Sequence, residues 1–210
     1  MELYYKDLGL IEYKKAWDIQ KQTLKKVIEH QQPDTLYLLE HPNTYTLGKG
    51  ANEKNLIADE SFLEDHRISV IRIDRGGDIT YHGPGQIVGY PIINLNSVNK
   101  SSRRYIWNIE ETIIRTCKFF GIKSGRNEQH TGVWIEDRKI CAIGIKLSRW
   151  VTSHGFAFNV NTDLKIFKGI IPCGITDKAV TSLEAEAGKK FDIQEVKEVV
   201  KNEFINVFGY

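Results

Sequence analysis

The residue of this 210-residue chain that is best suited to nucleophilic chemistry is Cys173. It stands between Pro172, which stiffens the approaching chain, and Gly174, whose bare backbone amide could face a substrate carbonyl. Loops of this kind are where reactive groups tend to be found. Most free cysteines are instead small buried hydrophobes, and Cys117 and Cys141 fit that description because each lies in an apolar, periodic segment. The sequence therefore predicts Cys173 as the nucleophile.

A thiol with an ordinary pKa of about 8.5 is mostly protonated at neutral pH, so a reactive cysteine needs a neighbouring cation or base. Six histidines occur, at positions 30, 41, 66, 82, 130 and 154, but none is paired with Cys173 by its place in the sequence. Lys139, at the start of a predicted strand, is a further candidate, although a lysine there is ordinarily a solvated turn residue. The residues alone leave the partner of the thiol open.

The most unusual segment is residues 75–86, which read Arg-Gly-Gly-Asp-Ile-Thr-Tyr-His-Gly-Pro-Gly-Gln. Adjacent glycines after a strand let the backbone take positive φ and approach a ligand closely. The Gly-Pro-Gly at 83–85 adds a second stiff turn, so the segment is either a shaped wall of a ligand site or an ordinary glycine-rich hairpin. Its spacing matches neither a P-loop nor a dinucleotide fingerprint.

The composition argues against several functional classes. A formal net charge of +2, from 29 basic and 27 acidic side chains, argues against bulk nucleic-acid binding but allows a local basic patch for an acidic protein. We expect no metal site, because neither Cys-x-x-Cys nor His-x-x-x-His spacing occurs. We expect no membrane association, because no apolar run approaches the ~20 residues of a membrane span. Three widely spaced cysteines indicate free thiols and a cytoplasmic location.

The elements that position these residues follow from hydrophobic periodicity, which predicts one α+β domain over residues 1–210. Helices are expected at 11–30, at 103–120 and after the N-cap Asp192. Strands are expected at 3–7, 35–39, 44–47, 68–73, 86–95, 133–135, 140–147 and 151–160. Gly89 and Pro91 predict a bulge or an edge position for the 86–95 strand. Residues 136–139 are expected to form a hairpin turn, and 161–190 to be rich in loops.

Taken together, these segments resemble the lipoyl(octanoyl) transferase family, from Glu40-His41-Pro42 to Thr181-Ser182-Leu183. Four ordered motifs carry the resemblance: the 75–86 segment, Lys139-Ile140-Cys141-Ala142-Ile143-Gly144, His154-Gly155-Phe156-Ala157 and Ile171-Pro172-Cys173-Gly174. Several ordered motifs of this kind are hard to obtain by chance. The resemblance implies the fold of biotin and lipoate protein ligases, which is a mixed, largely antiparallel sheet flanked by helices.

The resemblance also implies a reaction. An octanoyl group would pass from octanoyl-acyl carrier protein to Cys173 as a thioester, and then to a lysine of a lipoyl domain, without a cofactor. The acceptors would be the lipoyl domains of 2-oxoacid dehydrogenases and the glycine cleavage H protein, and Lys139 would lower the pKa of the thiol. The residues expected to line the acyl site are Arg75, Gly76, Gly77, Asp78, Ile79, Thr80, Tyr81, His82, Ala142, Ile143, Gly144, Gly155, Phe156 and Ala157.

Three other functions are compatible with much of this pattern. An ATP-dependent lipoate ligase would share the fold and need no cysteine, a cysteine hydrolase would release the acyl group to water, and a non-catalytic module would only bind the acyl carrier. The Arg-Gly-Gly-Asp motif and Pro172-Cys173-Gly174 favour the transferase over the ligase. Because acyl carrier proteins are acidic, we expect Lys49, Lys146 and Arg149 to contribute to a docking surface beside the site.

Overall fold

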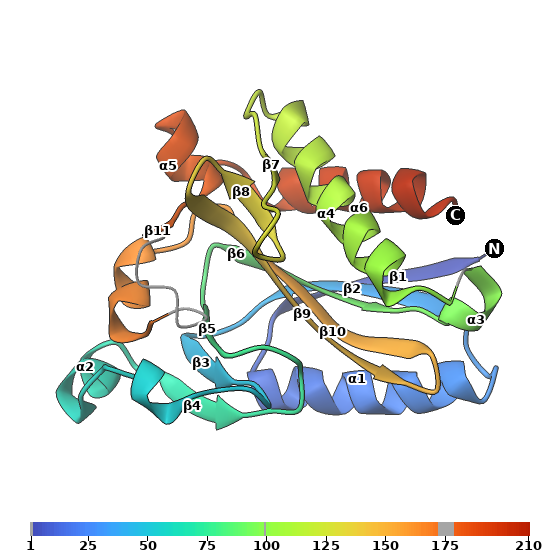
Figure 1. Cartoon of the computed structure of the whole chain (residues 1–210), viewed down its shortest axis with the longest axis horizontal. Coiled ribbons are helices and arrows are strands. Elements are labelled where there is room, and N and C mark those ends of the chain that lie inside the picture. The colour runs from blue at the N-terminus through green and yellow to red at the C-terminus, as the bar shows by residue number, and fades with distance from the viewer. Residues whose placement is uncertain (1, 99, 172–178) are drawn as a thin grey trace.

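Three long helices are present in the part of the chain that the computed structural model describes, which is residues 2–98, 100–171 and 179–210 (Figure 1). They are α1 (Tyr13–Ile28), α4 (Ser102–Phe119) and α6 (Ile193–Phe208). The side chain of Asp192 accepts a hydrogen bond from the backbone N–H of Gln194 and so caps α6. The predictions of these helices and of the Asp192 cap are confirmed.

The large sheet has eight strands and mixed direction. In spatial order it consists of β1 (Leu3–Leu10), β2 (Asp34–Glu40), β6 (Gln86–Ile92), β10 (Val151–Asn159), β9 (Arg138–Ser148), β8 (Val133–Ile135) and β7 (Gly125–Arg126), with β11 (Ala179–Val180) beside β9. The pairs β1–β2 and β9–β11 are parallel, and the other pairs are antiparallel. The predicted α+β class with a mixed, largely antiparallel sheet is confirmed.

A small second sheet and several short helices complete the described chain. The small sheet has the order β4 (Ser69–Arg72), β3 (Thr44–Leu47) and β5 (Ile79–His82). The short helices are α2 (Glu60–Asp65), α3 (Leu95–Val98) and α5 (Leu183–Ala187), with 3₁₀ turns at Glu53–Asn55 and Leu164–Gly169. Strand β5 lies inside the glycine-rich segment and was not among the strands expected from the sequence. It pairs with β3 along its whole length, so the segment is anchored to the small sheet.

Helices cover both faces of the large sheet: α1 packs on one face, and α4 and α6 pack on the other (Figure 1). The alternation of strand residues decides which core each side chain joins. Phe156 and Phe158 of β10 join the core under α4 and α6, while Ala157 joins the core under α1. The next residue on the Ala157 face is Asn159, a polar side chain that is only 4% exposed.

The structure corrects the expected position of β6. This strand is not at an edge but lies between β2 and β10. The irregularity that Gly89 and Pro91 predicted is in its pairing with β10, which ends at the Gly89–Phe156 pair. A Cβ at Gly89 would lie 2.1 Å from Cζ of Phe156, so the ring needs the glycine. The carbonyl of Pro91 accepts hydrogen bonds from the hydroxyls of Thr152 and Tyr105 in place of a ladder partner.

The hairpin between β8 and β9 is tighter than predicted. The turn consists of Glu136 and Asp137 alone, with Glu136 at φ 52°, and β9 begins at Arg138. Lys139 is therefore the second residue of a strand and not part of the turn. Its position is fixed on both sides, since it pairs with Trp134 of β8 and Val180 of β11.

Candidate active site

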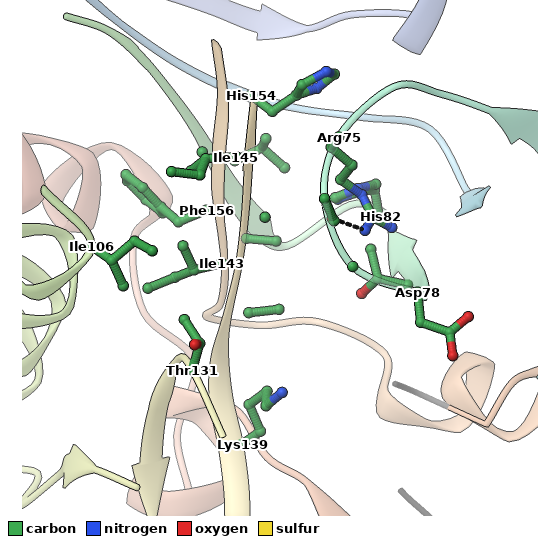
Figure 2. Close-up of a pocket in the computed structure, with 18 of the residues that line it drawn as sticks. Arg75, Asp78, His82, Ile106, Thr131, Lys139, Ile143, Ile145, His154 and Phe156 are labelled. Carbon is green, nitrogen blue, oxygen red and sulfur yellow. Dashed lines mark hydrogen bonds between the residues drawn. The ribbon is translucent and has the colours of Figure 1, made fainter. Parts of the chain in front are cut away.

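A cavity of about 400 Å³ brings the three predicted acyl-site segments together. It lies beside β9 and β10, and among the residues that line it Lys139 is at one end and His154 at the other (Figure 2). Of the predicted residues, those that line it are Arg75, Gly76, Gly77, Asp78, Ile79, Thr80, His82, Lys139, Ala142, Ile143, Gly144, Gly155, Phe156 and Ala157. Tyr81 does not line it: its ring packs with Tyr45 and Phe167 in the core of the small sheet.

The cavity reaches both faces of β9 because the pairing of β9 with β8 stops at Cys141. Beyond that point the segment after Arg75 lies along the strand edge, and the N–H of Gly76 donates to the carbonyl of Ile145 at 3.0 Å. Ile106, Ile143 and Phe156 lie on one side of the strand and Arg75 and His82 on the other (Figure 2). The first group supplies the apolar wall that a hydrocarbon chain needs.

The Arg75 side chain is a fixed wall of the cavity. It is 8% exposed, and its Nη2 donates to the carbonyl and hydroxyl of Thr46 at 2.9 and 3.0 Å. A Cβ at Gly144 would lie 3.1 Å from Cδ of Arg75, so this glycine makes room for the arginine. Asp78 fixes the other end of the segment, accepting hydrogen bonds from the backbone of Asn52 and from the side chain of Asn55.

The protonation of His82 is determined by its neighbours. Nε2 of Gln86 donates to the carbonyl of Tyr81 at 3.1 Å and to Oδ1 of Asn159 at 2.9 Å, so Oε1 of Gln86 must face Nδ1 of His82, 2.9 Å away. Nδ1 therefore carries the proton, and Nε2 is an acceptor 3.4 Å from the hydroxyl of Thr46. Burial lowers the pKa of His82 well below 6.5, so the ring is a neutral wall of the site.

Further along the wall, two tyrosines and a histidine form a buried polar group. Nε2 of His41 accepts from the hydroxyl of Tyr90 at 2.7 Å, because its Nδ1 donates to the carbonyl of Ile11, also at 2.7 Å. Burial lowers the pKa of His41 to about 4 and raises that of Tyr13 to about 12. These groups stay uncharged at neutral pH, which suits a wall that faces an uncharged ligand.

At the end opposite Lys139, three side chains form a charged cluster. Asp74 accepts from Nε2 of His154 at 2.8 Å and pairs with Nζ of Lys146 at 2.5 Å. Burial alone would raise the pKa of Asp74, but these two hydrogen bonds outweigh it and lower the pKa to about 2. Burial lowers the pKa of His154, so this ring is neutral at pH 7. Lys146 is therefore engaged by Asp74 and is a poor candidate for the docking surface.

Lys139 stands where the cavity meets the end of β11. Its Nζ lies 4.7 Å from the ring centroid of Trp134, and its carbonyl accepts from the N–H of Thr181 at 3.0 Å. The ammonium is half-buried beside an aromatic face, which holds it in place at a small cost in hydration. The strand position, rather than the expected turn, directs this side chain to the cavity.

Cys117 and Cys141 are buried, as the periodicity predicted. Cys117 and Cys141 are both 0% exposed in the core under α4 and α6. Burial raises the pKa of Cys117 to about 12 and that of Cys141 well above its ordinary value, so both are protonated at neutral pH. Cys173, with Pro172 and Gly174, lies outside the described residues.

Sequence reasoning missed the polar residues that support the site. Asn159, Gln86, Asp74, Tyr13 and Tyr90 were not predicted. A signal for Asn159 was available, because a polar residue shares the alternating face of Ala157 within an apolar strand. The histidine partners of Asp74 and Tyr90 are 49 or more positions away, and Tyr13 sits on α1, so no local pattern links these residues to the site. Gln86 bonds the nearby His82 and Tyr81, but its contact with Asn159 spans 73 positions.

The described residues contain neither a metal-ligand cluster nor a membrane-spanning helix. There, no group of three or more His, Cys, Asp or Glu side chains is arranged to hold a metal ion. None of the helices over those residues is both long and apolar enough to cross a membrane.

The lipoyl protein ligase A/B catalytic domain family matches residues 12–205 of the chain. An octanoyltransferase of Cytophaga hutchinsonii is 45% identical, and the similarity covers 96% of this chain and 91% of that protein. An octanoyltransferase of Rubrobacter xylanophilus is 46% identical with the same coverage of both chains.

The fold is also that of solved ligase structures. A putative lipoate protein ligase from T. acidophilum with bound lipoic acid superposes with a TM-score of 0.73, covering 100% of this chain and 87% of that one. The sequence identity is 14%, so this similarity establishes the fold alone.

Proposed function

The chain belongs to the lipoyl protein ligase A/B catalytic domain family, and we propose that it transfers an octanoyl group from octanoyl-acyl carrier protein to a lysine of lipoyl domains. The observation that carries this proposal is the similarity, over nearly the whole chain, to proteins named octanoyltransferase. The acceptors would be the lipoyl domains of 2-oxoacid dehydrogenases and the glycine cleavage H protein. One catalytic domain, residues 1–210, would carry out both half-reactions.

The shape of the cavity supports an acyl substrate. Its volume of about 400 Å³ is within the range of small-molecule sites, and Ile106, Ile143 and Phe156 give it an apolar wall. The neutral His82 ring and the anchored Arg75 side chain line the cavity on the other side of β9.

We assign the nucleophile to Cys173 and its activation to Lys139. The Cys173 thiolate attacks the thioester carbonyl carbon, the C=O π electrons move to oxygen, and their return expels the carrier thiolate. The acceptor lysine then attacks the acyl-enzyme, a stable amide forms, and the Cys173 thiolate leaves. Lys139 stabilises the thiolate as an ammonium, gives its proton to the departing carrier thiolate, and then, as a neutral amine, accepts a proton from the incoming lysine. A reducing compartment such as the cytoplasm would keep the thiol free.

The two other cysteines are poor alternatives for this role. Cys117 and Cys141 are fully buried, and their pKa values are raised by that burial. An acyl group on either would also have to replace core packing. This leaves Cys173 as the thiol that the proposed chemistry requires.

Intact mass after mixing with octanoyl-acyl carrier protein tests the proposal. We expect an adduct of octanoyl mass that maps to Cys173, is absent in Cys173→Ser and persists in Cys117→Ala and Cys141→Ala. An adduct on Cys141 would refute the assignment. Activity that required ATP and free octanoate would favour the ligase, and octanoate release without an acceptor would favour the hydrolase. Unchanged acyl transfer by Cys173→Ser would mean that the reaction does not require a thioester on Cys173.

A further inference from the structure

A second, much smaller cavity adjoins the acyl cavity at Lys139. Its volume is about 20 Å³, and it shares Thr80, Lys139, Ala142 and Ala157 with the large one. The residues that line only the small cavity are Gln86, Asn159, Phe167 and Val180. A space of this size holds one oxygen atom, as it would hold one water molecule. Hence the site combines a large apolar space and a one-atom space that meet at the lysine.

The amide of Asn159 is fixed in orientation where it lines the small cavity. Its Oδ1 accepts from Nε2 of Gln86 at 2.9 Å, and its Nδ2 donates to the carbonyl of Thr181 at 2.9 Å. The carbonyls of Tyr81 and Thr181 settle these directions, since a carbonyl only accepts. The plane of the Asn159 amide is therefore held from both ends.

This arrangement leaves Asn159, which lines the small cavity, with one further donor. An asparagine amide nitrogen carries two hydrogens, and the described residues supply an acceptor, the Thr181 carbonyl, for one of them. Gln86 has no such spare donor, because both of its N–H groups are used by Tyr81 and Asn159. Asn159 is 4% exposed, so an N–H at this position would act without competition from bulk water.

We propose that Asn159 is a catalytic residue whose side-chain N–H stabilises the oxyanion during acyl transfer, a role that rests on the function proposed above. When a thiolate adds to the carbonyl carbon, the π pair becomes a full negative charge on oxygen, in the one-atom space beside Lys139. The Nδ2–H of Asn159 donates to that oxygen, and the charge returns to the C=O bond as the leaving thiolate departs. The second half-reaction places the same oxygen in the same space.

The role depends on preorganisation. A donor whose plane is already held by Gln86 and Thr181 need not reorganise when charge develops, so it favours the transition state more than the ground state. The Thr80 hydroxyl borders both cavities but can rotate away, which makes it a weaker candidate. Loss of one such donor typically slows the chemical step by about 10²–10³-fold.

The test compares two reactions of the same thiol. Acyl-enzyme formation from octanoyl-N-acetylcysteamine, a small thioester, passes through an oxyanion, whereas alkylation by iodoacetamide does not. Asn159→Ala should slow acylation by about 10²–10³-fold and leave the alkylation rate and its pH midpoint as in the wild type. Asn161→Ala is the matched control: Asn161 bonds Phe191 through both amide atoms and lines neither cavity, so its acylation rate should match the wild type.

Two outcomes would overturn the role of Asn159. Acylation by Asn159→Ala within about threefold of the wild type would remove the donor from the mechanism. A fall in alkylation that parallels acylation, with a shifted pH midpoint, would show that Asn159 acts by positioning Lys139 through Thr181. If Asn159→Ala does not fold, Asn159→Asp decides, because it keeps the shape and the acceptor for Gln86 but cannot donate, and we expect at least the same loss.

The failure of this inference is distinguishable from failure of the proposed function. A wild-type adduct at Cys173, together with normal acylation in Asn159→Ala, would leave the transferase proposal intact and refute the oxyanion role alone. Absence of any octanoyl adduct in the wild type would refute both.

Discussion

Nζ of Lys146 lies 2.5 Å from Oδ2 of Asp74, so the lysine on β9 and the acid just before the Arg-Gly-Gly segment form an ion pair beside the 400 Å³ cavity. His154 of β10 completes the cluster through the other oxygen of Asp74. These contacts join the small-sheet side of the site to the large sheet. They also distinguish Lys146, which is ion-paired with Asp74, from Lys49 and Arg149, which are exposed to solvent.

The first prediction is that Asp74→Asn destabilises the protein in a pH-dependent way. The pKa of Asp74 is lowered from 3.8 to about 2, so its contribution is present above pH 3.8 and lost as the pH falls through about 2. Because Asp74 is 33% exposed, we expect only about 1 kcal/mol at pH 7. Urea denaturation at pH 7 and near pH 2 measures the free energy of unfolding of the variant and of the wild type. An equal difference in this free energy at both pH values would contradict the prediction.

The second prediction concerns Lys139 and the reactivity of Cys173. A cation within about 4–6 Å lowers the pKa of a neighbouring acid by about 1–3 units, so Lys139→Met should raise the pH midpoint of Cys173 alkylation by about that amount. Lys139→Arg keeps the charge but cannot give up a proton, so it should preserve the midpoint while transfer to the acceptor amine slows. An unchanged midpoint in Lys139→Met would remove Lys139 from the activation of the thiol.

The third prediction is that Gly89→Ala disturbs the acyl cavity through Phe156. The new Cβ would lie 2.1 Å from the Phe156 ring, which lines the cavity, so the ring must move. Overpacking of this kind costs about 1–3 kcal/mol, and transfer should slow as the apolar wall shifts. Thermal unfolding and octanoyl transfer measure the two effects.

Gly125→Ala is the matched control for Gly89→Ala. A Cβ there meets nothing within 4 Å, so its stability should stay within about 0.5 kcal/mol of the wild type. Equal stabilities for Gly89→Ala and Gly125→Ala would show that the Phe156 ring yields without cost.

The fourth prediction assigns carrier docking to Arg149 and Lys49, which are exposed, rather than to Lys146. Reversing either charge should raise KM for octanoyl-acyl carrier protein about two- to fivefold, a loss of about 0.4–1 kcal/mol, with kcat almost unchanged. The effect should shrink at high salt and vanish with octanoyl-N-acetylcysteamine. Lys123→Glu, which lines neither cavity, is the control. Identical KM values for all variants at two ionic strengths would place docking elsewhere.

Several features of the fold could be predicted from the sequence, because their causes are local. Helices α1, α4 and α6 follow from apolar side chains at helical spacing, and the Asp192 cap follows from a side chain that bonds two residues ahead. Burial of Cys117 and Cys141 follows from the same periodicity. The segment from Arg75 could be identified as a candidate wall because adjacent glycines allow close approach of the backbone, and the structure places it along the cavity.

The supporting contacts of the site were decided by the tertiary structure. Gln86 and Asn159 are 73 positions apart, and Asp74 and His154 are 80 apart, so each pair meets only when the strands take their places in the sheets. The interior position of β6 likewise depends on β10, whose Phe156 ring fills the space that Gly89 leaves open.

The physical reason for this division is the range of the interactions. Periodicity, capping and turn geometry act within a few residues, so the chain order alone specifies them. The direction of a buried hydrogen bond depends instead on which acceptors surround it, as the carbonyls of Tyr81 and Thr181 fix the amides of Gln86 and Asn159. The sequence thus determined which elements form and where reactive types of residue stand, and only the packed sheet determined that Asn159 and Lys139 line one small cavity.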